Sequence, residues 1–528
     1  MAERRLPASL APLATPIFRW IWIAAMVSNL GTWMQNVGAA WLMVSLSHSP
    51  LLIALVQTAT TLPVFLLGVP AGVVADLVDR RKLLLVTQAW MLAAATVLGV
   101  MTMLGHTGPW MLLGLTFALG LGATMNGPAW QATVPQLVDR EHLPAAVALN
   151  SVQFNIARAL GPALGGLVVA IWNPGIAFLF NAVSFLAVIL VLYFWRSYQP
   201  PVTERTESAI TAMMAGYRFV RHSTVLNAVL TRTAAFVIFG SAIWALLPVV
   251  AAHEIGSSSS GYGILLGCLG VGAVIAAISF AQLRKMVDPD RLLFSGTIVY
   301  ATATLALGAL SRFELLCLAM VAGGVAWMAV MSTFNVTAQL ALPAWVRARA
   351  LSFYIFTFQA GLALGSWIWG EVALRFGTRR ALFIAAAGLV ASMAVAIRFR
   401  LSGLEPMDLT PSMHWPEPTA QNPLDPSQGP VLIEVEYIID PARRGEFLEI
   451  MRQSETIRRR DGAIQWGIFV DTAEAGRYVE TFLVESWAEH LRQHERGTVS
   501  DRLVQERANA FHTASTPPKV RHLIAAGD

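Results

Sequence analysis

Long apolar runs recur along this chain, and they constrain its fold more than any other feature. A helix of about 20 residues crosses the ~30 Å hydrocarbon layer of a bilayer. Because a backbone in lipid must satisfy its own hydrogen bonds, such runs form helices. The sequence predicts an all-α membrane protein with twelve transmembrane helices, at 17–46, 51–75, 83–104, 109–132, 145–171, 176–195, 225–251, 262–283, 292–311, 314–342, 347–372 and 379–399.

The charges support this class and indicate an orientation. Of the 528 residues, 55% are hydrophobic and 13% are charged, against roughly 25% charged in soluble domains. With a cytoplasmic N-terminus, the inward segments as far as Arg400 carry 18 Lys and Arg, and the outward segments carry four. This positive-inside bias predicts that both termini are cytoplasmic. It also explains the net charge of +5 without nucleic acid as a partner.

The spans fall into two groups of six, which predicts two bundles. A weak repeat supports a duplication, since "ALGPALGG" at Ala159–Gly166 recurs as "ALGSWIWG" at Ala363–Gly370. Transporters built from duplicated halves hold substrate near mid-membrane between them. The predicted segments are a cytoplasmic tail (1–16), an N-terminal six-helix bundle (17–195), a cytoplasmic linker (196–224), a C-terminal six-helix bundle (225–400), a Pro-rich linker (401–430) and a cytoplasmic domain (431–528).

The last hundred residues read as a soluble α+β domain. "VLIEVEYIID" at 431–440 alternates apolar and acidic residues, as a half-buried strand does. A helix around Phe447–Ile457, strands at 463–470 and 478–486, one long helix at 487–512 and a last strand near 520–524 follow. This β-α-β-β-α-β order predicts a ferredoxin-like fold.

A charged loop interrupts the apolar sequence between the second and third spans. Its sequence "GVVADLVDRRK" resembles the signature loop of the major facilitator superfamily, with Asp79 where a glycine is usual. The resemblance implies a gate in which acids and arginines latch the cytoplasmic side shut and release it during the cycle. The alternative is a plain positive-inside anchor. The implied gating residues are Gly72, Asp76, Asp79, Arg80 and Arg81.

The fifth span carries a second match. Gly161, Pro162, Gly165 and Gly166 resemble the motif that marks exporters of this superfamily. Proline bends a helix, and glycines let a neighbouring helix approach closely, so a packing kink is the alternative. Residues 17–400 as a whole resemble the siderophore- and macrolide-exporting branch, which implies secondary active export of small amphiphiles across the bacterial inner membrane, with protons as the coupling ion. The C-terminal domain resembles the antibiotic-biosynthesis-monooxygenase fold.

Polar residues inside the spans are candidates for a substrate cavity. Arg158 lies about 18 Å from the cytoplasmic end at 1.5 Å per residue, where an arginine costs at least ~3 kcal/mol and needs water or a partner. For the amides, bonding between helices is an equally good explanation. The candidates are Asn29, Trp33, Asn36, Ser151, Asn155, Arg158, Arg232, Asn335 and Gln359.

Coupling and cofactors have weaker signals. No Asp or Glu lies deep in a span, so a proton carrier is not evident. Either an acid near a span end titrates (Asp76, Glu254, Glu314 or Glu371), or the cargo is an anion or acid held by Arg158 and Arg232. His490 and His494 are helix neighbours without a third ligand, so no metal is expected, and no cofactor motif or catalytic residue is found. The sequence leaves open an importer, a tethered enzyme, a sensor, and dimerisation through the C-terminal domain.

Overall fold

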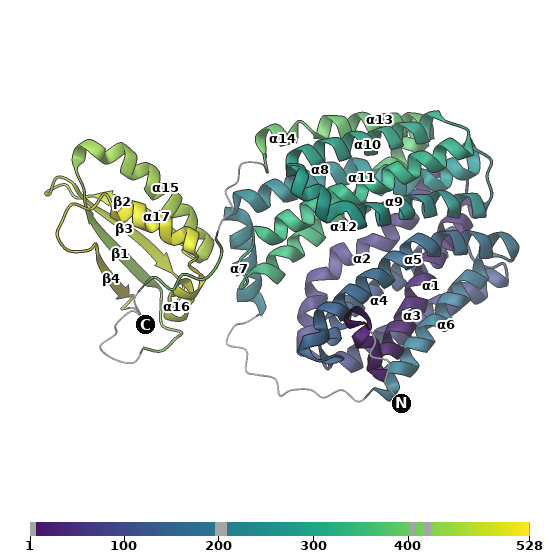
Figure 1. The fold of residues 1–528 in the computed structure, drawn as a ribbon, viewed down its shortest axis with the longest axis horizontal. Coiled ribbons are helices and arrows are strands. Elements are labelled where there is room, and N and C mark those ends of the chain that lie inside the picture. The colour runs from purple at the N-terminus through teal and green to yellow at the C-terminus, as the bar shows by residue number, and fades with distance from the viewer. Residues whose placement is uncertain (1–6, 196–208, 402–407, 416–423, 527–528) are drawn as a thin grey trace. The chain divides into compact units, whose positions relative to one another are not determined.

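The computed structural model describes residues 7–195, 209–401, 408–415 and 424–526 (Figure 1). Within these ranges, eleven helices are long and apolar enough to cross a membrane. The first predicted span forms the 31-residue helix α1, which is not among the eleven. The long helices are α1 (Pro16–Leu46), α2 (Pro50–Leu77), α3 (Arg80–Met103), α4 (Pro109–Thr133), α5 (Leu143–Ile171), α6 (Pro174–Phe194), α8 (Thr224–Val249), α9 (Ser259–Met286), α10 (Pro289–Ala309), α11 (Phe313–Leu340), α12 (Arg347–Phe376) and α13 (Thr378–Ser392).

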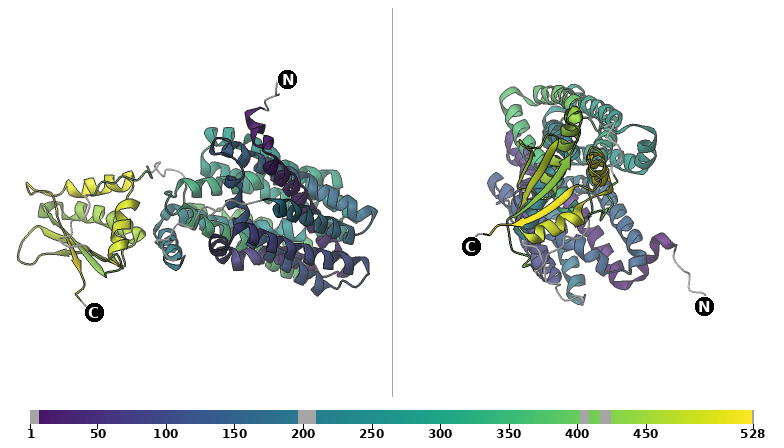
Figure 2. Two further views of the ribbon diagram at one scale, coloured as in Figure 1. Left: turned by 90° about the horizontal axis from the view of Figure 1, so that it is seen from below. Right: turned by 90° about the vertical axis from the view of Figure 1, so that its left-hand side faces the viewer.

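Prolines start many of these helices. Pro16, Pro50, Pro109, Pro174 and Pro289 each occupy the first turn, where a missing N–H costs nothing and the fixed φ suits a helix. Within each group of six long helices the connections are short, so consecutive helices run in opposite directions. Figure 2 shows the ribbon from two further sides. We call the end of the bundle where α1 begins the near end, and the end where α1 finishes the far end.

Two units make up the chain. The first holds residues 1–203, 231–335 and 355–402, and the second holds 204–230, 336–354 and 403–528. In the first unit, α1 packs against α5 and α6, α3 packs against α4 and α6, and α5 packs against α9. A cluster that includes Phe18, Leu84 and Leu192 forms the near-end core of α1 to α6.

The second unit contains a four-stranded antiparallel sheet. Strands β1 (Val431–Ile438), β2 (Gln465–Val470), β3 (Arg477–Val484) and β4 (Lys519–Ile524) lie in the order β2-β3-β1-β4. Alternate residues of β1 are buried, as predicted, and pack with Phe447 and Met451 of α15 (Arg444–Asp461). The predicted polar linker contributes the helix α7 (Ala209–His222), while 196–208 lies outside the described residues.

The single long helix predicted at 487–512 is wrong. The structure has two helices, α16 (Trp487–Arg496) and α17 (Val499–Asn509). Thr498 caps α17, because its hydroxyl accepts from the N–H of Asp501 while the Asp501 carboxylate accepts from the N–H of Thr498. This capping box satisfies two helix-end donors, and it fixes the break between α16 and α17.

Acid should unfold this domain before the rest of the chain. Burial lowers the pKa of His490 to about 3 and of His494 to about 4, with neighbouring histidines adding to the effect. The unfolded chain takes up these protons near pH 6.5, so stability is present above that pH and falls as pH drops toward 4, by about 1.4 kcal/mol per unit for each fully buried histidine. We expect His490→Gln to lower the acid midpoint, measured as protection of β1 from a hydrogen-exchange pulse.

The matched control is His106→Gln, which changes an exposed histidine beyond α3. The His490→Gln variant retaining the native acid midpoint would contradict this account, since the histidine would then contribute no proton uptake.

Candidate functional site

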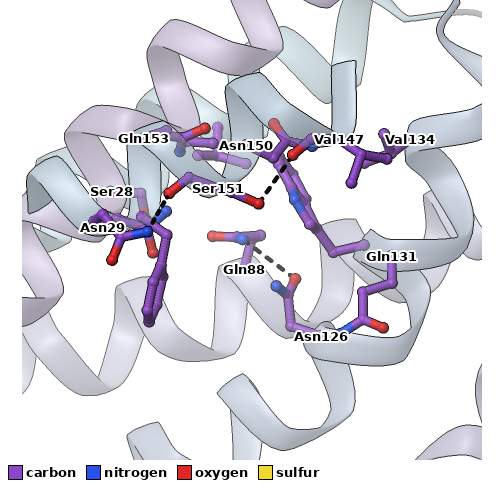
Figure 3. Close-up of a pocket in the computed structure, with 15 residues that line it drawn as sticks. Ser28, Asn29, Gln88, Asn126, Gln131, Val134, Val147, Asn150, Ser151 and Gln153 are labelled. Carbon is purple, nitrogen blue, oxygen red and sulfur yellow. Dashed lines mark hydrogen bonds between the residues drawn. The ribbon is translucent and has the colours of Figure 1, made fainter. Parts of the chain in front are cut away.

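A polar cavity of about 690 Å³ lies among α1, α3, α4 and α5 toward their near ends (Figure 3). Its wall combines seven side-chain amides with six apolar residues. None of the described residues that line it is acidic or basic. The lining residues are Ala25, Ser28, Asn29, Gln88, Asn126, Trp130, Gln131, Val134, Val147, Asn150, Ser151, Gln153, Phe154, Asn155 and Val188.

Three of the predicted cavity residues meet here. Asn29 comes from α1, and Ser151 and Asn155 come from α5. On α5 both side chains bond to their own helix: Ser151 Oγ donates to the Val147 carbonyl at 3.1 Å, and Asn155 Nδ2 donates to the Ser151 carbonyl at 2.8 Å. These local bonds hold the two side chains along the cavity wall. They leave the side-chain oxygen of Asn155, Oδ1, as an acceptor.

Two lining amides, Gln88 of α3 and Asn126 of α4, were not among the residues predicted from the sequence. Gln88 Nε2 donates to Asn126 Oδ1 at 3.2 Å, and Thr87 Oγ1 donates to the same oxygen at 3.2 Å. The pair therefore forms an ordered patch on the wall (Figure 3). One sequence pattern could have pointed to Asn126. The sequence Thr124-x-Asn126 recurs as Thr333-x-Asn335, so the same residue types occur at corresponding positions of the two halves.

Other predicted cavity residues lie elsewhere. Trp33 packs on Gly161, where an added Cβ would lie 2.5 Å from the Trp33 Cβ. Asn36, Asn335 and Gln359 are half-buried and do not line this cavity.

Arg158 stands at the middle of the 29-residue helix α5. Its guanidinium lies 5.8 Å from the ring of Trp244 on α8, which belongs to the other half of the bundle. Its Nε has no hydrogen-bond partner, and no ion pair joins it to a carboxylate in the part of the chain that the structure describes. An unpaired cation at this depth is costly, so the site favours an anion or water there.

Arg232 does not line this cavity. Its Nη1 pairs with Asp290 at the first turn of α10 and donates to the carbonyl of Phe399 at 3.3 Å. The residue is 8% exposed. The ion pair joins α8 to α10, and the bond to Phe399 adds the residue that follows α14 (Val395–Arg398).

The glycines around Pro162 lie where α5 packs against two neighbours. A Cβ on Gly165 would lie 2.7 Å from the Met34 Cα of α1, and one on Gly166 would lie 2.5 Å from the Ser259 carbonyl oxygen. Gly263 of α9 lies directly opposite, since its own added Cβ would meet the Pro162 carbonyl at 2.5 Å. The motif therefore brings α5 of one half against α9 of the other.

The charged loop between α2 and α3 bonds within its own half. Arg80 Nη1 donates to the Ala132 carbonyl at 3.3 Å, at the near end of α4. Arg81 Nη2 donates to the Tyr193 carbonyl at 2.6 Å, and its Nε to that of Leu192, at the near end of α6. A Cβ on Gly72 would meet nothing within 4 Å. The Asp76 side chain lies outside the described residues.

Asp79 is the N-cap of α3, since its carboxylate accepts from the Lys82 N–H at 2.9 Å. We expect Asp79→Ala to cost about 1 kcal/mol of local stability, so amides of the first turn of α3 exchange about fivefold faster by hydrogen exchange. Asp139→Ala is the matched control, because the Asp139 side chain makes no cap bond. If the amides of the first turn of α3 exchanged equally fast in the Asp79 and Asp139 variants, the Asp79 cap would contribute nothing to local stability.

Described contacts between the two halves run from mid-length to the far end. His48 stacks on His253 with ring centroids 5.5 Å apart, and Thr58 Oγ1 donates to the Ala363 carbonyl at 3.0 Å. The contact between Phe65 and Phe356, at 4.6 Å between centroids, is the one nearest to the near end in this set. The polar cavity lies beyond these contacts, on the near side.

Comparison with known proteins places the chain among secretion proteins. A family model described as transmembrane secretion effector matches residues 7–528. The staphyloferrin A transporter of Staphylococcus aureus (strain NCTC 8325 / PS 47) is 24% identical over 301 residues, which are 54% of this chain and 72% of that protein. Enterobactin exporter EntS of Salmonella choleraesuis (strain SC-B67) is 26% identical over 287 residues, which are 54% of this chain and 68% of that protein.

Solved structures share the fold of the helical bundle. A bacterial homolog of the human lysosomal transporter Spinster, in an inward-facing and unoccupied conformation, matches with a TM-score of 0.56 at 15% identity, over 73% of this chain and 95% of that one. The nucleoside transporter NupG matches with a TM-score of 0.56 at 13% identity, over 73% of this chain and 99% of that one. At these identities the likeness concerns the fold alone.

Proposed function

Since the chain belongs to the transmembrane secretion effector family, we propose that it is a secondary transporter that exports siderophore-like molecules across the bacterial inner membrane. The single observation that carries this proposal from the geometry is Arg158 at mid-helix in α5, whose Nε has no hydrogen-bond partner and whose guanidinium lies 5.8 Å from the ring of Trp244 in the other half. The relatives named as siderophore transporters support the same cargo class.

The proposed mechanism is alternating access. Counting α1, twelve helices cross the membrane as two halves, and the near end is the cytoplasmic one because it carries the basic loops. Contacts between the halves at the far end close the outside, while the amide-lined cavity accepts cargo from the cytoplasm. The halves then rock about α5 and α9, which opens the far end.

Arg158 is the proposed anchor for cargo. A guanidinium binds carboxylates and similar planar anions through two parallel bonds. The amides of the cavity, including Asn29, Gln88 and Asn126, then donate to and accept from the rest of the molecule. With Arg232 paired to Asp290, the anchor on the cargo is Arg158 alone in this proposal.

Gating and coupling follow the superfamily resemblance. We propose that Arg80, Arg81, Asp76 and Asp79, with Gly72 in the same loop, latch the near end in the opposite state of the cycle and release it when the cavity opens inward. Their bonds to α4 and α6 would be the released arrangement. Coupling to protons makes the export an antiport.

The second unit carries a domain of its own. Its strand order and β-α-β-β-α-α-β sequence of elements support a ferredoxin-like fold in which the second helix is split in two. We propose that this domain at 431–528 is cytoplasmic and acts as a regulator or a dimer contact, with no enzymatic activity of its own.

Flux in proteoliposomes tests the function. One pH unit is worth about 1.4 kcal/mol, so a one-proton antiport should build about a tenfold cargo gradient. We expect enterobactin or staphyloferrin A to move toward the acidic compartment in vesicles that carry the protein, and not in empty vesicles or with a protonophore. Flux unaffected by the pH gradient would remove the antiport claim, and movement with the protons would make the protein an importer.

A further inference from the structure

A second cavity, of about 410 Å³, lies inside the C-terminal domain. It is bounded by the inner face of the sheet and by α15, α16 and α17, and this volume falls within the ~300–1,000 Å³ range of small-molecule sites. Aromatic and histidine rings line its walls, together with one cationic side chain, that of Arg458. The lining residues include Trp415, Arg458, Phe482, His490 and Gln493.

The charges of this cavity are matched. The Arg458 guanidinium lies 4.9 Å from the Trp415 ring and 4.6 Å from the Phe482 ring, and its Nε donates to Glu480 at 3.2 Å. His490 is neutral at physiological pH because burial lowers its pKa to about 3. A charged ligand would find no free counter-charge here, whereas a flat uncharged ring would stack on the aromatic walls.

Two buried polar groups of α16 have no partner. His490 Nδ1 lies 3.4 Å from Gln493 Oε1, and since that oxygen can only accept, Nδ1 carries the hydrogen. His490 Nε2 is then a bare acceptor, and Gln493 Nε2 is a donor without an acceptor. Each residue is 3% exposed. Unsatisfied buried groups of this kind are uncommon and suit a ligand that offers both a hydroxyl hydrogen and an oxygen acceptor.

The same helix grips two other segments. Glu489 accepts from Arg218 of α7 at 3.2 Å and from Arg496 at 2.6 Å, and it is 1% exposed. The Arg496 guanidinium in turn lies 4.6 Å from the ring of Trp345, in the segment between α11 and α12. We call these contacts of Glu489 and Arg496 the α16 clasp.

We propose that this cavity is a regulatory site for an uncharged, planar ring compound that carries hydroxyl groups, and that α16 transmits its occupancy to the α16 clasp. The cavity and the α16 clasp are both formed by α16 in the position that it occupies in this structure. A ligand that fits the cavity as it stands therefore favours the clasped state, by the reciprocity of linked equilibria. Because α7 leads into α8 and Trp345 precedes α12, the clasp restrains segments that enter two helices of the C-terminal half.

Hydrogen exchange of the full chain in nanodiscs tests both parts. The probe is resorcinol, which is planar, uncharged and dihydroxylated, and the matched control compound is isophthalate, which has the same ring with two negative charges. At ten times its Kd, resorcinol should slow exchange in α16 about tenfold and should also slow exchange in α7, whereas isophthalate should change neither. Protection by isophthalate, or none by resorcinol, would overturn the ligand class.

Variants separate this site from binding elsewhere. Gln493→Leu removes the unpartnered donor and should weaken resorcinol protection of α16 at least tenfold, while Gln465→Leu on the exposed edge strand β2 should leave it unchanged. Glu489→Gln should retain ligand protection of α16 and lose that of α7. Protection that survives Gln493→Leu would place the ligand elsewhere, and α7 protection that survives Glu489→Gln would overturn the clasp. These readouts need no transport, so they stand apart from the export proposal.

Discussion

Arg158→Gln should lower the export rate of an anionic siderophore at least about 100-fold. The change keeps hydrogen-bonding groups in place but removes the charge that would hold the cargo, and losing one partner of a buried charge pair costs about 2–5 kcal/mol. Arg158 has no carboxylate partner among the described residues, so the substitution breaks no ion pair seen in the fold. Initial efflux rates from proteoliposomes measure the effect.

The matched control is Arg375→Gln. Arg375 lies at the far end of α12, is 69% exposed and pairs with Glu371 one turn earlier. Surface pairs of this kind contribute little, so this variant should export at the native rate. Arg158→Lys should recover part of the activity, because it restores the charge without the planar fork. Native export by Arg158→Gln would remove the residue from the cargo site.

Gly166→Ala should shift the transporter away from the state with a closed far end. The added Cβ would meet the backbone oxygen of Ser259 at 2.5 Å, and backbone cannot rotate aside as a side chain can. Overpacking of this kind costs about 1–3 kcal/mol, which corresponds to a roughly 5- to 150-fold change in the balance between the two states. The export rate should fall with it.

Crosslinking across the far end measures that balance. The pair His48→Cys and His253→Cys replaces the stacked histidines, in a background where Cys268 and Cys317 are alanine. A short thiol crosslinker should join the halves readily in the parent and poorly with Gly166→Ala. Gly114→Ala is the control, since an added Cβ there meets nothing within 4 Å. Equal crosslinking in the two glycine variants would show that the close approach of α5 and α9 does not set the state.

The sequence predicted the positions of the helices better than the side-chain pairings between them. Apolar length indicated each span, because lipid leaves a backbone few alternatives. The amide wall of the cavity was only partly predicted, because Gln88 and Asn126 also bond to each other and an amide pair between helices gives the same pattern. The position of Arg232 inside a predicted span made it a cavity candidate, but the sequence could not reveal its pairing with Asp290, which lies 58 residues away. The break at Thr498 was readable from its capping box.

The contact of Gly166 with Gly263 bears on how cargo could reach the passage. The two backbones touch without an intervening side chain, so along this stretch the seam between α5 and α9 is too narrow to admit an acyl chain or a flat amphiphile sideways. A molecule dissolved in the bilayer therefore cannot enter between α5 and α9 at this height of the bundle.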